Sequence, residues 1–431
     1  MRVSFSSLKL LFASLTMAVV LVASAASAAN TVAVGTCMQN LVQFSTIQDA
    51  VNHSPSGTII DVCPGSYPEQ VTINKNLTLK GVADPNSNQD AAIIVVPSGG
   101  VTANAKSLTS NAPIAAQILV QSPATAVTIS GMTIDGSGNN LTDCSVNLIG
   151  VYFQNASGTV VASALRNQAL APALSGCQDG LGVFAQSGSG GTSNVTVQQT
   201  SVHNYDKNGI TGNESGTTLT ATQNVVQGAG SANNPPGAAQ NGIQIGFGAT
   251  GTVTGNTVLD QVYGDITQAI SIGVLLYDAA SNSGIKVSSN NINNTQGGVG
   301  IYTDDSDSSE YGDGVKVQSN NIFETLNYDA IDVCTDGNTI TNNTIANTAE
   351  SAIHLDASCS GSGHTTGNSN TVSGNIMLES GCAGILEDSG TSNTVGQNTF
   401  VAIPFTVLMG TCPASGSVKR APGKVLFHPV R

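Results

Sequence analysis

Three observations predict that the chain is all-β and folds as a single-stranded right-handed parallel β-helix, a solenoid of stacked coils. In one repeated phrase, an aliphatic residue is followed three positions later by Asn and two positions after that by another aliphatic residue. Between its copies stands a second phrase, a small residue followed by two aliphatic residues separated by one position. The composition agrees, because 48 Gly and abundant β-branched residues suit short strands and bends better than helices.

The Asn phrase sets the period of the solenoid. Its clear copies contain Asn256, Asn290, Asn320, Asn343, Asn375 and Asn398. Counted from a looser copy at Asn224, successive Asn residues are 32, 34, 30, 23, 32 and 23 positions apart. The short steps predict single coils, and the long steps predict coils with an inserted loop. Stacking would place these Asn side chains above one another at a bend, where each amide can bond to the next.

The second phrase predicts strands with one face inward and one outward. Its alternation is that of a β-strand, and such strands hide their apolar face only when coils stack in parallel at about 4.8 Å. We therefore expect one continuous domain over residues 30–412, although its length would otherwise suggest two or three domains. The copies are Gly242-Ile-Gln-Ile245, Gly273-Val-Leu-Leu276, Gly298-Val-Gly-Ile301, Ala330-Ile-Asp-Val333 and Ala352-Ile-His-Leu355.

The two ends of the chain differ in composition from the repeated part. Residues 1–29 combine early positive charge, an apolar run and a small-residue Ala-x-Ala ending, which predicts a cleaved export signal. The alternative is a membrane anchor, which the short run and its hydroxyl residues disfavour. We expect a secreted protein, extracellular or periplasmic, with no membrane attachment after cleavage. Residues 413–431 contain Pro, Gly, Ser and four positive charges and predict a flexible tail.

Eight Cys residues in an exported chain predict four disulfides. Metal binding is the alternative, but the tight Cys-x-x-Cys or His-paired spacing that it needs is absent. Nearest-neighbour spacing predicts the pairs Cys37 with Cys63, Cys144 with Cys177, Cys334 with Cys359, and Cys382 with Cys412.

The first coil needs a cap, because the end of a solenoid exposes its core. Ser45-Thr-Ile-Gln48 matches a capping box, with Ser45 as the N-cap. Ile47, Ala50 and Val51 would form one apolar face of a short helix that covers the core.

The charge of the chain excludes nucleic acid as a partner. The net charge is −14, and of only 13 Lys and Arg residues two lie in the export signal and four in the tail. We expect a monomer whose partner is a polysaccharide or cell-surface glycan.

The segment from Ser45 to Gly81 resembles the beginning of right-handed parallel β-helix proteins of the pectate-lyase-like superfamily. The resemblance rests on Ser45-Thr-Ile-Gln-Asp-Ala-Val51, on Gly57-Thr-Ile-Ile-Asp-Val-Cys-Pro-Gly-Ser-Tyr67 and on the spaced aliphatic residues that follow. With the Asn phrases it extends over about residues 37–412. It implies that the protein acts on polysaccharide. Different members of the superfamily are lyases, hydrolases, esterases or epimerases, and others are adhesins. The complete catalytic motifs of the enzyme families are missing, and this sequence contains only fragments of them, such as Asp304-Asp305.

The outward positions of the second phrase predict a catalytic site. Asp332 and His354 would be neighbours across one coil step, and Asp356 shares a strand face with His354. The Asp332–Asp356 diagonal is about 8 Å between backbones, within the range of inverting glycosidases. Our hypothesis makes the two Asp residues acid and base, with His354 tuning their protonation. Tyr277 and Tyr302 would form a sugar-stacking platform, and Asp304 and Asp305 would contact substrate.

Two further questions stay open at this point. No cofactor is expected to be required, although the acidic loop Thr303 to Glu310, with Asp313 nearby, offers oxygen ligands that suit Ca²⁺. The protein is either an enzyme that cleaves glycans, as a hydrolase or lyase, or a non-catalytic glycan-binding or cell-surface structural protein. A metal-handling solenoid is a third class, disfavoured by only five His residues.

Overall fold

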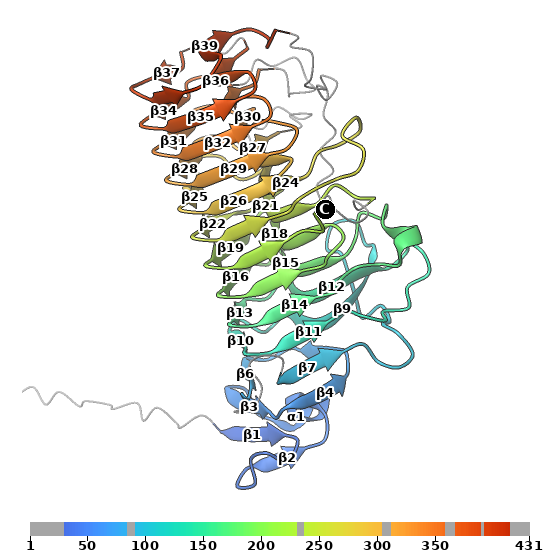
Figure 1. Ribbon diagram of the computed structural model, residues 1–431. Coiled ribbons are helices and arrows are strands. Elements are labelled where there is room, and N and C mark those ends of the chain that lie inside the picture. The colour runs from blue at the N-terminus through green and yellow to red at the C-terminus, as the bar shows by residue number, and fades with distance from the viewer. Residues whose placement is uncertain are drawn as a thin grey trace, which may run out of the picture.

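The computed structural model describes residues 30–83, 91–230, 237–303, 312–357, 367–388 and 392–413. Over these ranges the chain winds into an elongated solenoid with three long sheets along its length (Figure 1). The predicted export signal and residues 414–431 of the predicted tail lie outside the described residues. No helix within the described ranges is both long enough and apolar enough to span a bilayer.

The first sheet carries the residues that precede the Asn phrase's bend. Within the described residues its strands are β1 (Thr31–Val34), β2 (Val42–Phe44), β3 (Thr58–Val62), β6 (Leu77–Gly81), β10 (Val127–Ser130), β13 (Gly158–Val161), β16 (Ser193–Gln198), β19 (Thr217–Thr222), β22 (Thr250–Thr254), β25 (Lys286–Ser288), β28 (Lys316–Gln318), β31 (Thr339–Thr341), β34 (Thr371–Ser373) and β37 (Thr394–Val395).

The second sheet follows that bend in each coil. Its described strands are β4 (Gly65–Pro68), β7 (Ala92–Val95), β11 (Thr133–Asp135), β14 (Ala164–Arg166), β17 (Ser201–His203), β20 (Val225–Gln227), β23 (Thr257–Leu259), β26 (Asn291–Thr295), β29 (Asn321–Thr325), β32 (Thr344–Thr348), β35 (Ile376–Ser380) and β38 (Thr399–Val401).

The third sheet contains the second sequence phrase. Its described strands are β5 (Val71–Ile73), β9 (Pro113–Gln121), β12 (Asn147–Gln154), β15 (Leu181–Gln186), β18 (Asn208–Asn213), β21 (Asn241–Gly246), β24 (Ile272–Tyr277), β27 (Gly297–Tyr302), β30 (Ile331–Val333), β33 (Ile353–Leu355), β36 (Ala383–Glu387) and β39 (Phe405–Met409), with the short β8 (Ala105–Lys106) beside β9. Among the described strands, only the β8–β9 pair is antiparallel.

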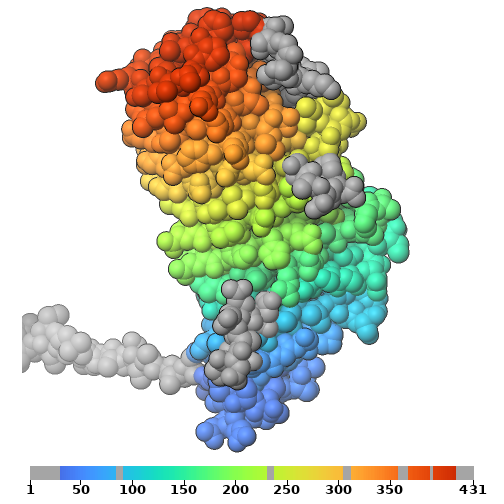
Figure 2. All heavy atoms as spheres, viewed as in Figure 1, coloured from blue at the N-terminus to red at the C-terminus, as the bar shows by residue number. Residues whose placement is uncertain are grey.

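The register stacks equivalent aliphatic residues into one core. Val287 pairs with Val317, and Val317 pairs with Ile340, so the phrase that repeats in the sequence repeats coil by coil in space. These three side chains are completely buried and belong to a cluster that runs from the N-terminal coils to β36. The predicted all-β parallel solenoid is therefore confirmed, and Figure 2 shows its coils as continuous stacked bands.

The predicted Asn ladder is also present, at the bend between the first and second sheets. Asn320 Nδ2 donates to Asn343 Oδ1 at 2.9 Å, and Asn290 Nδ2 donates to Asn320 Oδ1 at 2.9 Å. The residue before each ladder Asn from Asn224 to Asn375 has a positive φ, for example 56° at Ser289 and 56° at Ser319. This left-handed residue turns the chain sharply, and the ladder amides satisfy backbone groups that the turn leaves without a partner.

The capping helix α1 (Ile47–His53) covers the N-terminal part of the core, with Ile47, Ala50 and Val51 buried. The predicted N-cap is wrong by one residue, because Thr46 Oγ1, not Ser45, accepts from Asp49 N at 3.1 Å. The Glu69 carboxylate accepts from the backbone N–H groups of Ile47 and Gln48, so a partner distant in sequence completes the cap. The only other described helical turn is η1 (Pro172–Leu174).

Three of the predicted disulfides are confirmed, namely Cys37–Cys63, Cys144–Cys177 and Cys382–Cys412. Cys334 is disulfide-bonded as well, and its predicted partner Cys359 lies outside the described residues. Disulfides of this kind persist in oxidising compartments, which agrees with an exported protein.

Candidate functional site

Two of the predicted site residues lie side by side on the third sheet. Asp332 of β30 and His354 of β33 are register partners on consecutive coils, as the sequence predicted. Asp356 follows β33, and its backbone N–H donates to Val333 O at 2.9 Å, which holds it against the preceding coil. The alternation of inward and outward residues therefore brings the three predicted catalytic residues to one place.

Two further carboxylates complete the cluster and were not predicted. Asp329, in the turn before β30, places Oδ2 3.0 Å from His354 Nδ1. Asp388, which follows β36, places Oδ2 3.5 Å from His354 Nε2. Asp388 stands one coil beyond Asp356 at the same offset from its strand, since Leu355 pairs with Glu387. That equal offset is the sequence signal that would have identified Asp388.

The carboxylates of the acidic pair lie closer together than the two carboxyl groups of an inverting glycosidase. One carboxylate oxygen of Asp332 and one of Asp356 lie within 4.8 Å of each other, while the predicted distance of about 8 Å is a distance between backbones. The side chains converge because both stand on the same outer face and turn toward the same point. This upper limit is below the roughly 5–5.5 Å of retaining glycosidases and shorter than the inverting range.

The cluster is buried although it stands on the outer side of the sheet. Asp332 is 1% exposed, Asp356 5% and His354 8%, while the Asp388 side chain is 22% exposed and marks where the cluster meets solvent. Burial raises the pKa of Asp332 well above its usual value; the His354 charge opposes this rise, and Asp356 and Asp329 add to it. Burial lowers the pKa of His354, but Asp329, Asp388 and Asp332 outweigh it and raise that pKa well above its usual value.

The predicted tyrosine platform has a different geometry from an open surface. Tyr302 is 1% exposed, and its hydroxyl donates to Asp332 Oδ2 at 2.9 Å. Tyr277 is half-buried one coil earlier, in register with Tyr302, and packs in an apolar cluster with Leu275. Tyr302 thus holds Asp332 in place, while substrate contact by Tyr277 stays a prediction. The other predicted substrate residues, Asp304 and Asp305, lie outside the described residues, as does most of the predicted Ca²⁺ loop.

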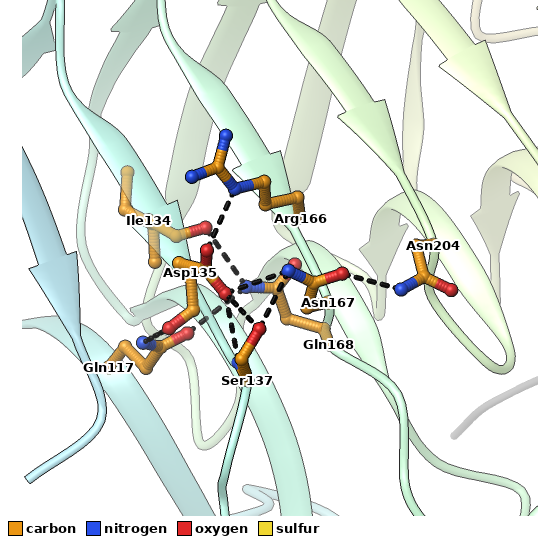
Figure 3. Close-up of polar contacts among 8 residues, drawn as sticks. All are labelled: Gln117, Ile134, Asp135, Ser137, Arg166, Asn167, Gln168 and Asn204. Carbon is orange, nitrogen blue, oxygen red and sulfur yellow. Dashed lines mark hydrogen bonds and ion pairs between the residues drawn. The ribbon is translucent and has the colours of Figure 1, made fainter. Parts of the chain in front are cut away.

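A second polar cluster lies on the second sheet, near a cavity of about 630 Å³ that residues 138–142 and 169–171 line. Figure 3 shows the Asp135 carboxylate at its centre, with side chains from neighbouring coils pointing toward it. Arg166 Nε donates to Asp135 Oδ2 at 2.8 Å, and Asn167 Nδ2 donates to Asp135 Oδ1 at 2.8 Å. Although burial opposes it, hydrogen bonds from Asn167, Ser137 and Arg166 lower the pKa of Asp135 to about 2. Such a stably ionised, fully bonded carboxylate is a structural group and not a proton donor.

The Asp135→Asn variant tests that structural role. We expect its free energy of unfolding at pH 7 to be lower by about 1–3 kcal/mol. The substitution removes the charge and replaces the oxygen that accepts from Arg166, while the remaining oxygen can still accept from Asn167. The contribution of Asp135 is present above its unfolded pKa near 4 and is lost as the pH falls toward 2. Chemical denaturation at pH 7 and pH 2.5 measures both. A difference from wild type that persists unchanged at pH 2.5 would contradict this assignment.

Comparison with known proteins identifies the fold. No protein-family model matches the sequence, and a search of curated proteins finds no relative. The structure is similar to the GH136 lacto-N-biosidase from Eubacterium ramulus, with a TM-score of 0.55 and 10% identity over 87% of this chain and 68% of that chain. It is also similar to the Dettilon tailspike protein, with a TM-score of 0.52 and 13% identity over 86% of this chain and 68% of that chain. The chain is thus a right-handed parallel β-helix protein.

Proposed function

We propose that the protein is a secreted enzyme that cleaves glycosidic bonds in a polysaccharide at the third sheet, with Asp332 and Asp356 as the reacting carboxyl groups. The observation that carries the proposal is the approach of these two carboxylates to within 4.8 Å on the outer side of a sheet. Glycoside hydrolases use a pair of acidic side chains at a comparable spacing. Their surroundings hold them there, since Tyr302 donates to Asp332 and Val333 O fixes the backbone of Asp356.

The spacing favours hydrolysis with retention of configuration. One carboxylate attacks the anomeric carbon while the other, as the acid, gives its proton to the departing glycosidic oxygen. Water then attacks the anomeric carbon of the glycosyl ester, the ester bond breaks, and the water proton returns to the second carboxyl group. The half-buried ring of Tyr277, one coil before Tyr302, is the aromatic surface that we assign to the sugar.

The fold comparison supports the proposal at the level of chemistry. One of the structures similar to this chain is a lacto-N-biosidase, so this architecture carries glycoside cleavage in at least one protein. The low content of positive charge and the acidic surface suit a neutral glycan better than an acidic one.

The test is a screen of neutral polysaccharides with the mature protein and three variants. We expect wild type to release sugars with the anomeric configuration retained in the first-formed product, observed by NMR. Asp332→Asn and Asp356→Asn should each lower the rate at least about a thousandfold. Asp265→Asn removes an exposed carboxylate outside the cluster and should leave the rate unchanged.

Cleavage at the wild-type rate by Asp332→Asn or Asp356→Asn would overturn the proposal. Binding of a glycan with no cleavage by wild type would overturn it too, and would favour the alternative of a non-catalytic glycan-binding or cell-surface protein. Melting temperatures of all variants show whether a lost rate reflects lost folding.

A further inference from the structure

The two ring nitrogens of His354 have different surroundings. Nδ1 lies 3.0 Å from Asp329 Oδ2, and Asp329 Oδ1 accepts from Ser351 N at 2.7 Å, so the imidazole is fixed through a carboxylate that is itself fixed. Nε2 is buried and has no hydrogen-bond partner among the described residues. A histidine whose one nitrogen is held by a carboxylate and whose other nitrogen has no hydrogen bond has the arrangement of a metal ligand, and the metal displaces the proton of that second nitrogen when it binds.

Nε2 faces the carboxylate of Asp388, and Asp356 lies one coil before Asp388. Donor atoms of His354, Asp356 and Asp388 all lie within 4.8 Å of one another. Nε2 and Asp388 Oδ2 are 3.5 Å apart, longer than a good hydrogen bond. Two ligands at 2.0–2.1 Å from one tetrahedral Zn²⁺ are about 3.4 Å apart, so the spacing fits two donors that share a cation.

We propose that His354 Nε2, Asp356 and Asp388 form a site for one divalent transition-metal ion, for which Zn²⁺ is the probe. One imidazole nitrogen with carboxylate oxygens favours such an ion over Ca²⁺, which takes oxygen ligands alone. Three protein ligands leave a coordination position for water at Asp388, the side of the cluster that meets solvent. Cys334 also lies near Asp332 and Asp356, but its sulfur is in a disulfide and is not a thiolate ligand.

The site gives the proposed enzyme a means of regulation. This step rests on the proposed function, whereas metal binding itself does not. Asp356 is both a reacting carboxylate and a metal ligand, so it cannot react with the glycan while it binds the ion. A bound ion therefore inhibits glycan cleavage, and a chelator restores it.

The experiment titrates ZnCl₂ and, separately, CaCl₂ into tag-free mature protein that has been dialysed against a chelator, with calorimetry and melting temperature as readouts. We expect one Zn²⁺ per chain and a raised melting temperature. His354→Gln and Asp388→Asn should each weaken Zn²⁺ binding at least tenfold. Asp143→Asn, which removes an exposed carboxylate elsewhere, should bind as wild type does. Ca²⁺ should not compete for the site.

No Zn²⁺ binding by folded wild type, or equal binding by folded His354→Gln and Asp388→Asn, overturns the proposal. Asp388→Asn changes a partly exposed side chain, so it tests the site even where the buried His354→Gln variant fails to fold. The binding readouts need no substrate, which separates this result from the fate of the proposed function. If cleavage is found and Zn²⁺ binds without inhibiting it, the regulatory step is wrong although the site stands.

Discussion

Replacing Asn320 with Ala is expected to lower the free energy of unfolding by about 3–5 kcal/mol, although the change removes only a small polar side chain. Its Oδ1 accepts from both the backbone N–H and the Nδ2 of Asn290, and its Nδ2 donates to Val287 O and Asn343 Oδ1. All these groups are buried, so the substitution removes hydrogen-bond partners from donors and acceptors on the two adjacent coils. Water cannot replace the lost bonds, because Asn320 is completely inaccessible.

The next residue provides a matched control. Asn321 stands on the exposed side of the same bend. Its backbone N–H donates to Asn290 O, and its side chain makes no hydrogen bond to the described residues. Asn321→Ala should therefore change the unfolding free energy by no more than about 0.5 kcal/mol. Guanidinium denaturation of both variants measures the difference. Equal losses would mean that the ladder adds no more stability than an ordinary polar residue in a turn.

The architecture could be predicted from the sequence because the solenoid repeats a local pattern. Val317 and Ile340 stand at the same place in successive phrases, and coil stacking turns that equivalence into contact. The same logic placed Asp332 beside His354. The N-cap of α1 was missed by one residue because Glu69, 21 residues beyond Gln48, satisfies the first helical N–H groups. Local sequence contains no sign of that contact.

The candidate site could be predicted only in part, since alternation fixes which face a residue occupies but not what lies over that face. Asp332 was expected on an open outer surface, yet it is 1% exposed. Tyr302 was expected to be open to a sugar, and its ring is buried with the hydroxyl on Asp332. Asp329 was missed because it belongs to a turn outside both repeated phrases, where no periodicity indicates direction.

The buried amine of Lys207 carries a large energetic cost. Its side chain is completely buried, and Nζ donates to Ala239 O at 2.6 Å. Burial alone lowers the pKa of Lys207 to about 7 from a usual value near 10.5, with no charged partner contributing to the shift. The difference corresponds to a cost of roughly 5 kcal/mol at or below pH 7 relative to the unfolded chain.

Lys207→Met should consequently be more stable than wild type at pH 6–7 and less stable at pH 10. Met keeps the length of the side chain and removes the charge, but it leaves Ala239 O without its donor, at about 1–3 kcal/mol. The unfolded chain holds the Lys proton up to about pH 10.5 and the folded chain only to about pH 7, so wild type gains about 1.4 kcal/mol per pH unit between them.

The variants can be compared by denaturant unfolding at pH 6, 8 and 10. The gain from Lys207→Met should shrink steadily above pH 7 and change sign before pH 10, once the cost of the buried charge falls below that of the unpaired carbonyl. Lys106→Met, at an exposed position, should show no such trend. If the Lys207→Met difference were independent of pH, the amine would have to keep its proton in the folded protein, and a counter-charge for it would have to exist near Ala239.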